Sequence, residues 1–276
     1  MRIHDAGMSE DRTVNDVRDA MAELVSRLTS HFGPGLQGLY LFGSLPAGWF
    51  RPGKSDIDLL AVLESDVGEG EALRALESLH ADFVAEYPAW HQRVEVGYVS
   101  RKVLQTFADV PAGRAAVIGP GEPLNVKDVG SNWLLDWHSV CTQGETLVGP
   151  PPLELGPLVA PDAYRRAVQS QLREWQKAVR APEVAYVPAH QGYIVATVCR
   201  ALYALATGEQ TSKENAVKWA AEQLPESATF ISEAYGWYSA DLSGPHKATI
   251  QFVDQALVEA ERFGPQPAIF KDESER

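Results

Sequence analysis

Two aspartates one residue apart, preceded by a glycine–serine pair, are the clearest chemical signal in this chain. The pair Gly43-Ser44 ends an apolar segment, and the acids Asp56 and Asp58 open the next one. Because successive side chains of a strand point to opposite faces, both carboxylates lie on one face there. Acids so close repel each other unless a cation lies between them, and carboxylate oxygens suit Mg²⁺. The pattern predicts a magnesium site beside a phosphate-binding turn.

A third acid, Glu95, lies in the segment 93–99, whose residues alternate as in a strand. Acidic residues are rare in strand centres because they lose hydration there. A position next to Asp56 and Asp58 would explain Glu95, since three carboxylates hold one or two Mg²⁺ ions that bridge the phosphates of a nucleoside triphosphate. We expect Glu95 either to bind metal or to accept the proton of an attacking hydroxyl.

The glycine–serine turn has features of a phosphate-binding loop. Gly43 lets the backbone approach a phosphate closely, and the Ser44 hydroxyl with nearby N–H groups would bind it at a helix N-terminus. Ser55 would assist from the other side of the loop. No Walker A motif is present, because no Lys-Ser or Lys-Thr pair follows a second glycine at the required spacing. The pattern therefore disfavours P-loop enzymes and kinases.

Each of these fragments taken alone has an ordinary structural explanation. Glycine–serine turns are common, and Asp-x-Asp also occurs in calcium loops and at solvated strand ends. Their order favours a functional site, because an apolar strand, the turn, the paired acids and a later strand-borne Glu95 follow one another.

The composition indicates a soluble, acidic, globular protein. The chain has 276 residues, 45% of them hydrophobic, and a formal net charge of -13. It can bury a substantial core and divide into two domains. The charge disfavours nucleic-acid binding and would steer a cationic small molecule toward a cleft. Cys141 and Cys199 have no metal-ligand spacing, and no apolar run is long enough to span a membrane. We expect a cytoplasmic monomer.

Periodicity predicts the elements that position these residues. Helices are expected over about 10–32 and 69–87, and strands over 36–42, 56–63 and 93–99. The turn after the first strand is expected to lead into a helix. The two core strands thus flank one loop, which carries the glycine–serine pair at one end and the aspartates at the other.

A proline-rich stretch near 150–160 indicates a domain boundary, and the chain beyond it has helical periodicity. We expect an α+β fold. Residues 1–155 would form a small mixed sheet flanked by helices, and residues 156–276 an α-helical bundle. The helices expected in the second part are 161–180, 190–207, 212–224, 226–239 and 244–263.

The first group of residues resembles the signature of the nucleotidyltransferase (DNA polymerase β-like) superfamily over residues 36–99. The second part carries Val198-Cys199-Arg200-Ala201-Leu202-Tyr203-Ala204, then Ser212-Lys213-Glu214 and Trp219-Ala220. This order resembles the aminoglycoside adenylyltransferases that modify streptomycin at the 3″ hydroxyl and spectinomycin at the 9 hydroxyl. The likeness extends over most of the chain.

The resemblance implies a role for each residue of the site. Ser44 and Ser55 would hold the triphosphate of ATP, the two aspartates would bind Mg²⁺, and Glu95 would be the catalytic base. Arg200 and Lys213 would reach the phosphates across the cleft, with Tyr238 near the adenine. Without the resemblance, Arg200 and Lys213 would be interpreted as solvent-exposed cations on helices and Tyr238 as an aromatic residue that packs against its neighbours.

The acceptor site departs from the family pattern. Trp175 falls where the family has a tryptophan that bears on streptomycin, although a half-buried helix aromatic explains it equally well. The short acidic loop that follows in the family is replaced here by the longer segment 176–191, in which Tyr186 and His190 stand roughly where acids are expected. Glu183 could substitute for one acid.

Further contacts could come from Trp133 and Asp136, in the segment 133–138. The altered loop makes spectinomycin-like acceptors a safer expectation than streptomycin.

The leading hypothesis is an ATP:aminoglycoside or aminocyclitol O-adenylyltransferase that confers antibiotic resistance, with ATP and Mg²⁺ bound between the domains. One alternative is transfer to another hydroxyl, on a metabolite, a lincosamide-like drug or a protein side chain. A second is a catalytically silent nucleotide-binding regulatory module. The three clustered acids argue against the silent module, because carboxylates are costly to keep together without a use.

Overall fold

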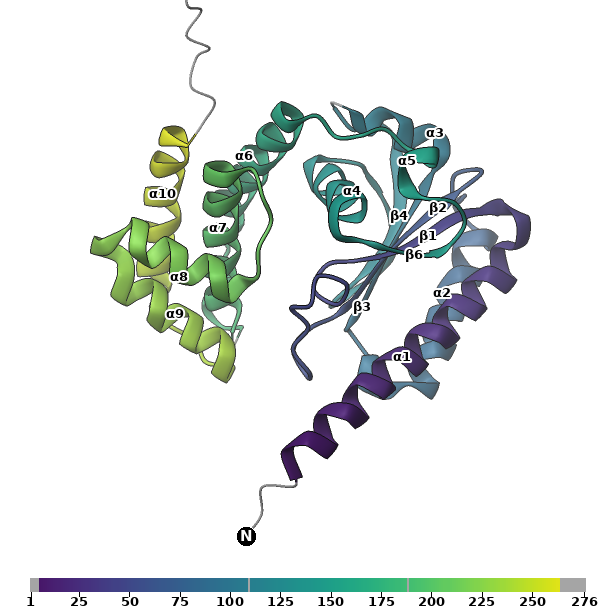
Figure 1. Ribbon diagram of the computed structural model, residues 1–276, viewed down its shortest axis with the longest axis horizontal. Helices are drawn as coiled ribbons and strands as arrows, with labels where there is room; N and C mark the ends of the chain where they lie inside the picture. The colour runs from purple at the N-terminus through teal and green to yellow at the C-terminus, as the bar shows by residue number, and fades with distance from the viewer. Residues whose placement is uncertain (1–4, 109, 188, 264–276) are drawn as a thin grey trace, which may run out of the picture. The chain divides into compact units, whose positions relative to one another are not determined.

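A computed structural model of the chain describes residues 5–108, 110–187 and 189–263 (Figure 1). The chain divides into two compact units, Met1–Ala160 and Pro161–Arg276, here called unit 1 and unit 2. Unit 1 contains a mixed sheet with helices, and the described part of unit 2 contains helices alone, so the fold is α+β as expected. Among the described residues, no helix is long and apolar enough to cross a membrane.

The sheet of unit 1 has six strands in the order β5-β4-β3-β2-β1-β6. Strands β2 and β3 run parallel, and the other neighbouring pairs are antiparallel. A parallel pair needs a crossover connection, and helix α2 supplies it here. The strands are β1 (Leu36–Phe42), β2 (Ile57–Leu63), β3 (Val94–Ser100), β4 (Arg114–Gly119), β5 (Glu122–Asp128) and β6 (Glu145–Val148).

Helices cover both faces of this sheet (Figure 1). Helices α1 and α2 lie on one face, and α4 lies on the other. The helices of unit 1 are α1 (Asp5–Phe32), α2 (Glu71–Glu86), α3 (Arg101–Leu104), α4 (Ser131–Gln143) and α5 (Pro152–Leu155), with 3-10 turns η1 (Gly33–Gly35), η2 (Pro88–Trp90) and η3 (Gln105–Ala108).

The alternation of side chains decides which face each residue of β2 and β3 meets. Ile57 and Val94 are buried in the core shared with α1 and α2. Gly97 lies on the opposite face, where a Cβ atom would come within 2.8 Å of the Trp133 ring of α4. Asp58 follows Ile57 by one residue, so its side chain points to the opposite face, toward α4. Glu95 precedes Gly97 by two residues and therefore lies on that same face.

Unit 2 is a helical bundle. Helix α7 is its centre, since it packs against α6, α8, α9 and α10 and its inner residues are almost fully buried. The helices are α6 (Pro161–Ala178), α7 (His190–Thr207), α8 (Lys213–Gln223), α9 (Ala228–Ala240) and α10 (His246–Arg262), with 3-10 turns η4 (Pro182–Ala185) and η5 (Pro225–Ser227).

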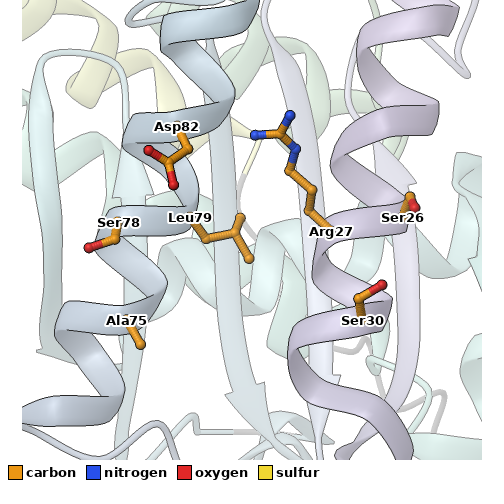
Figure 2. A pocket seen from close by; sticks show the side chains of 7 residues that line it. All are labelled: Ser26, Arg27, Ser30, Ala75, Ser78, Leu79 and Asp82. Carbon is orange, nitrogen blue, oxygen red and sulfur yellow. The ribbon is translucent and has the colours of Figure 1, made fainter.

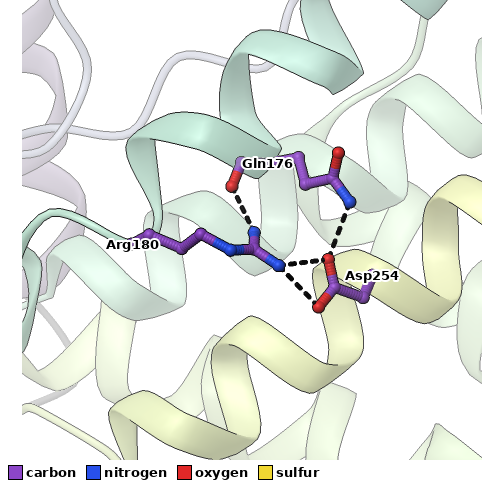
Figure 3. Close-up of polar contacts among 3 residues, drawn as sticks. All are labelled: Gln176, Arg180 and Asp254. Carbon is purple, nitrogen blue, oxygen red and sulfur yellow. Dashed lines mark hydrogen bonds and ion pairs between the residues drawn. The ribbon is translucent and has the colours of Figure 1, made fainter.

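The segment after Trp175 is anchored to α10. Arg180 makes a bidentate ion pair with Asp254, at 2.7 Å from each carboxylate oxygen, and Gln176 donates to the same carboxylate at 2.8 Å (Figure 3). Nearby, His246 Nε2 lies 2.6 Å from the carbonyl oxygen of Val179. These contacts give the segment that follows α6 a defined path.

The predicted strands are confirmed to within one residue, and the helix expected over 190–207 is confirmed at both ends. The helix expected after β1 is wrong. Residues 43–48 form turns closed by bonds such as Trp49 N–H to Ser44 O at 2.8 Å. Gly43 and Gly48 take left-handed backbone conformations, with φ of 76° and 74°, which interrupt a helix. Ser44 therefore lies in a turn and not at a helix N-terminus.

Candidate active site

Three carboxylates lie at the start of the only parallel strand pair in the described sheet. Asp58 of β2 is the register partner of Glu95 on β3, and Asp56 lies immediately before β2. We call Asp56, Asp58 and Glu95 the acid edge. Because register partners on neighbouring strands are adjacent on one face, backbone pairing alone brings Asp58 and Glu95 together. All three side chains are half-buried.

The carboxylate of Glu95 has the most unusual environment of the three. Burial raises its pKa above the ordinary value, and the negative charges of Asp56 and Glu122 raise it further, while Lys127 acts in the opposite direction. Desolvation and neighbouring negative charge both penalise the ionised form. A cation bound beside these acids would relieve the same penalty.

Position 43 requires a glycine because the carboxylate of Asp58 approaches its backbone closely. Its φ of 76° suits glycine, and a Cβ atom at this position would lie 2.1 Å from Asp58 Oδ2. The turn after β1 therefore passes directly over one carboxylate of the acid edge. This explains in physical terms why a glycine and an aspartate separated by a loop occur together in the sequence.

Ser44 and Ser55, predicted to hold the triphosphate, lie at the two ends of the loop between β1 and β2. Ser44 is half-buried in the turn. The Ser55 hydroxyl accepts a hydrogen bond of 2.9 Å from the backbone N–H of Arg51, and Ser55 N–H donates to Arg51 O at 2.9 Å. Ser55 thus closes a tight turn that leads into Asp56. Contact of either serine with phosphate stays a prediction.

Arg93 is a residue of this region that the sequence did not single out. Its guanidinium lies 4.7 Å from the Trp90 ring centroid and donates to the carbonyl oxygen of Ser55. Its Nε lies 3.9 Å from Asp56 Oδ1. The signal was available in principle, because Arg93 precedes Glu95 by two residues and so shares its face of the strand.

The acid edge has the chemistry of a divalent-cation site. Its donors are carboxylate oxygens, which suit Mg²⁺ or Mn²⁺, and the mutual repulsion of Asp56 and Glu95 would be reduced by a cation. Within the described residues, no three acid, histidine or cysteine side chains are already gathered at metal-binding distances. The residues fit a hard cation by type and by shared face, and Asp56, Asp58 and Glu95 as metal ligands stay a prediction.

Two further predicted residues lie on α4, above the same face of the sheet. Trp133 is only 4% exposed and packs over Gly97, which follows Glu95 by two residues on that face. Asp136 is half-buried one turn further along the helix. Burial limits the part of Trp133 that a ligand could touch, and contact of either residue with an acceptor stays a prediction.

In unit 2, four side chains from four helices form one aromatic–lysine cluster. Tyr193 of α7 lies between Trp175 of α6 and Tyr238 of α9, with ring centroids 5.9 and 6.1 Å away. Lys213 Nζ, at the start of α8, lies 4.9 Å from the Tyr193 centroid and 5.7 Å from that of Tyr238. The structure thus brings together three of the predicted residues, around a tyrosine that the sequence did not indicate.

Helix α7 presents a polar stripe beside this cluster. Tyr193, Thr197 and Arg200 recur at helical spacing and are half-buried, between neighbours that are almost fully buried. Within the described residues, the Thr197 hydroxyl and the Trp175 indole nitrogen are buried without a hydrogen-bond partner. Burial raises the pKa of the Tyr164 phenol, while its hydrogen bond with Gln210 and the charge of nearby Arg200 act in the opposite direction.

The remaining predicted acceptor residues lie around η4, and the structure does not gather them into the aromatic–lysine cluster. Glu183 is exposed within η4, and Tyr186 directly after it is 82% exposed. His190 begins α7, where burial lowers the pKa of its imidazole. Their contact with an acceptor stays a prediction.

A separate pocket of about 390 Å³ lies between α1 and α2 (Figure 2). Arg27 lines it, but this side chain already pairs with Glu23 at 2.6 Å and with Glu86. The helices that form it cover the face of the sheet opposite to the acid edge. The pocket is therefore separate from the candidate active site. It is lined by Ser26, Arg27, Ser30, Ala75, Ser78, Leu79 and Asp82.

Comparison with known families agrees with this division of the chain. Residues 21–107, which contain β1, β2, β3 and the acid edge, match the nucleotidyltransferase domain. Residues 155–259, which contain the aromatic–lysine cluster, match the C-terminal domain of aminoglycoside adenylyltransferases. The protein is an enzyme of the nucleotidyltransferase superfamily. Within that superfamily, the chain belongs to the aminoglycoside adenylyltransferases.

Solved structures support the fold. A spectinomycin adenyltransferase from Enterococcus faecialis, crystallised with ATP and spectinomycin, matches with a TM-score of 0.68 at 18% identity, over 90% of this chain and 98% of that one. At this identity the match shows a shared fold. A toxin-antitoxin structure with AMP-PNP matches 58% of this chain and 92% of its own at 19% identity, and its TM-score of 0.28 is too low to bear on the fold.

Proposed function

We propose that this enzyme transfers the adenylyl group of ATP to a hydroxyl of an aminocyclitol or aminoglycoside antibiotic, with spectinomycin-like acceptors favoured, and so confers resistance. The observation that carries the proposal is the register pairing of Asp58 with Glu95 in a nucleotidyltransferase domain, followed in one chain by the aminoglycoside adenylyltransferase C-terminal domain. The similar structure from Enterococcus faecialis holds ATP and spectinomycin, which supports the choice of substrates.

In this proposal Asp56 and Asp58, with Glu95, hold Mg²⁺. The metal when bound would neutralise negative charge on the triphosphate. Glu95 accepts the proton of the acceptor hydroxyl. The acceptor oxygen then forms a bond to the α-phosphorus as the bond from that phosphorus to pyrophosphate breaks. Gly43 and Ser44 would lie against the phosphates.

The roles of unit 2 in this proposal follow the family resemblance. Lys213 and Arg200 would bind phosphate, and Tyr238 would contact the adenine. The position of Lys213 beside two tyrosine rings supports a role in ligand binding, because an ammonium held among aromatic side chains is restricted in its orientation.

The acceptor preference rests on the segment after Trp175. That segment carries the exposed Tyr186 and the half-buried His190 where the family has acids, and it contributes the single exposed acid Glu183 in η4. Streptomycin carries two strongly basic guanidinium groups, which would gain most from clustered acids. A less basic aminocyclitol depends less on them, which supports spectinomycin-like acceptors.

The direct test is incubation of the purified protein with Mg-ATP and a panel that includes spectinomycin and streptomycin, followed by mass spectrometry. Addition of one adenylyl group to spectinomycin, with less or none on streptomycin, is the expected result. The Glu95→Gln variant is the matched control and should give far less product while it still binds ATP. An unmodified panel would overturn the proposal.

A nucleotidyltransferase with a different acceptor would be detected in the same experiment. If adenylyl groups appear on protein side chains or on another hydroxylated compound but on no member of the panel, the reaction type stands and the acceptor assignment is wrong. Binding of ATP with no transfer to any acceptor would indicate a regulatory module.

A further inference from the structure

Arg93 lies where the two strands of the acid edge begin. Its carbonyl oxygen accepts a hydrogen bond of 2.9 Å from Ile57 N–H, which ties the start of β3 to the start of β2. Ile57 pairs with Val94 and Asp58 with Glu95. The residues that precede the two strands, Asp56 and Arg93, continue the same register. This places Arg93 beside Asp56, on the face that carries Glu95.

The guanidinium of Arg93 is held in place from several sides. Its Cζ lies 4.7 Å from the ring centroid of Trp90, which is only 5% exposed. The backbone N–H of Arg93 also donates to Trp90 O at 3.1 Å, which fixes the backbone from which the side chain extends. Its Nη2 donates to the carbonyl oxygen of Ser55. A planar guanidinium that stacks on one group and donates to another has a fixed orientation, which a lysine would not reproduce.

One donor of this guanidinium is buried without an acceptor. Among the described residues, Arg93 Nε has no hydrogen-bond partner, and Asp56 Oδ1 at 3.9 Å is within ion-pair range but too far for a hydrogen bond. A buried donor without an acceptor is costly, so such a group calls for a functional explanation. Here the donor faces the first carboxylate of the acid edge.

From these contacts we propose that Arg93 is a positioning residue for the candidate active site. It fixes the Ser55 carbonyl and, by charge without a hydrogen bond, holds the Asp56 carboxylate toward the face it shares with Glu95. It thereby prepares Asp56 to bind the divalent cation that accompanies ATP. This role rests on the proposed function, because it assumes that the acid edge binds a metal-bound triphosphate.

The test compares Arg93→Met, which keeps the length of the stem, with Arg93→Lys, which keeps the charge but lacks the planar fork. Calorimetry would measure binding of Mn²⁺ alone and of Mg²⁺ with a non-hydrolysable ATP analogue. Loss of a residue that orients a metal ligand lowers metal affinity about 10- to 100-fold. We expect metal affinity to fall by this factor for Arg93→Met. For Arg93→Lys we expect a fall of at least the square root of that factor, about 3- to 10-fold.

Arg74→Met is the control, because Arg74 is an exposed arginine of α2 in the same unit. It should bind both ligands as the parent does, and thermal melting should show that all variants are folded. If Arg93→Met does not fold, Arg93→Gln replaces it in the same comparison.

Two results would overturn the proposal. Binding within twofold of the parent for Arg93→Met would exclude a role in placing Asp56. Full recovery by Arg93→Lys would show that a positive charge suffices and that the planar guanidinium, with its stacking on Trp90 and its bond to Ser55, has no part in placing Asp56. Because these measurements need no acceptor, they remain valid if the antibiotic assignment fails. Failure of the parent to bind Mn²⁺ and the ATP analogue would instead overturn the proposed metal site.

Discussion

The acid edge of unit 1 and the aromatic–lysine cluster of unit 2 are assembled in different ways. In the acid edge, Asp58 and Glu95 are neighbours because β2 and β3 pair in a fixed register. In the cluster, Trp175, Tyr193 and Lys213 come from different helices and meet through side-chain packing. A site set by backbone hydrogen bonds tolerates little displacement, whereas a site set by packing rings can adjust its rotamers.

This difference suggests a division of tasks. Transfer of a phosphoryl-type group depends on groups placed within fractions of an ångström, and paired strands supply that precision. Recognition of varied ligands depends on surfaces that adapt, and aromatic side chains on separate helices supply that. Substitutions in each region should separate these two tasks, and the largest effect is expected in the acid edge.

The largest effect is expected for Glu95→Gln, which removes the carboxylate while keeping the shape of the side chain. A general base contributes roughly 10²- to 10⁴-fold to a rate, so kcat should fall by about three orders of magnitude. Steady-state kinetics with ATP and spectinomycin would measure this. Turnover within tenfold of the parent would contradict the assignment of Glu95 as the base.

The second prediction is that the protein loses stability as the pH falls, because His80 in unit 1 resists protonation in the folded state. This buried imidazole lies 2.5 Å from the Tyr98 hydroxyl, and burial, aided by the nearby His31, lowers its pKa to about 4. In the unfolded chain His80 binds a proton near pH 6.5, so the free energy of unfolding should decrease as pH falls from about 6.5 to about 4. The loss approaches about 3 kcal/mol.

Urea denaturation across this pH range would measure the loss. His80→Gln should flatten the pH dependence, whereas His91→Gln, which changes an exposed histidine of unit 1, should leave it as in the parent. In unit 2, the bond to Arg180 lowers the pKa of Asp254. The stability that this ion pair contributes should therefore be lost only below about pH 4, where the carboxylate becomes protonated in the unfolded chain. Equal slopes for His80→Gln and the parent would contradict this assignment.

The third prediction tests how little displacement the acid edge tolerates. Gly43→Ala introduces a methyl group 2.1 Å from Asp58 Oδ2, which forces that carboxylate to move. We expect kcat to fall by about 10- to 100-fold, in the range seen when a catalytic group is displaced by about 1 Å. Gly48→Ala is the matched control, because its φ of 74° is similar and no atom lies within 4 Å of the added Cβ.

Both glycine variants should lose about 1–2 kcal/mol of stability from the left-handed backbone conformation. Only Gly43→Ala should also show a lower kcat. Equal kinetics for the two variants would show that the close approach to Asp58 has no part in the reaction.

The smallest effect is expected in the aromatic–lysine cluster. Tyr193→Leu removes the ring that Lys213 Nζ contacts at 4.9 Å, and exposed or half-exposed cation–π contacts contribute about 0.5–1 kcal/mol. The KM for ATP should therefore rise about two- to fivefold with little change in kcat. Tyr193→Phe keeps the ring and with it the contact to Lys213, so its KM should rise less than that of Tyr193→Leu. A large fall in kcat for Tyr193→Leu would mean that this cluster is as precisely constrained as the acid edge.

The two regions also differ in how far the sequence could predict them. Alternation within segment 93–99 places Glu95 on a definite face, and the structure has β3 at Val94–Ser100. Periodicity likewise predicts α7 at its observed ends. Information of this kind is local, because a strand or helix period is visible within one segment.

What could not be predicted depends on contacts distant in sequence. Alternation places Arg93 on the face of Glu95, but the sequence does not reveal its stacking on Trp90 or its bond to Ser55. Tyr193 is marked only by rings from two other helices. The helix expected after β1 was wrong because Gly43 and Gly48 take left-handed conformations, and at Gly43 the close approach of Asp58 leaves no room for a side chain. Strands β4, β5 and β6 were missed. Strands β5 and β6 are the edges of the sheet, β6 has only four residues, and all three strands are more exposed than β1, β2 and β3, so their apolar pattern is weak.

The parallel pairing of β2 with β3 constrains how this enzyme can change in length. The chain that joins them, residues 64–93, forms the crossover that includes α2. Residues inserted near the exposed start of that crossover would leave the strand register unchanged. A single residue inserted between Ile57 and Asp58, or between Val94 and Glu95, would turn one carboxylate toward the core that α1 and α2 cover. Natural or engineered variants should therefore differ in length around residues 64–70 and not within these strands.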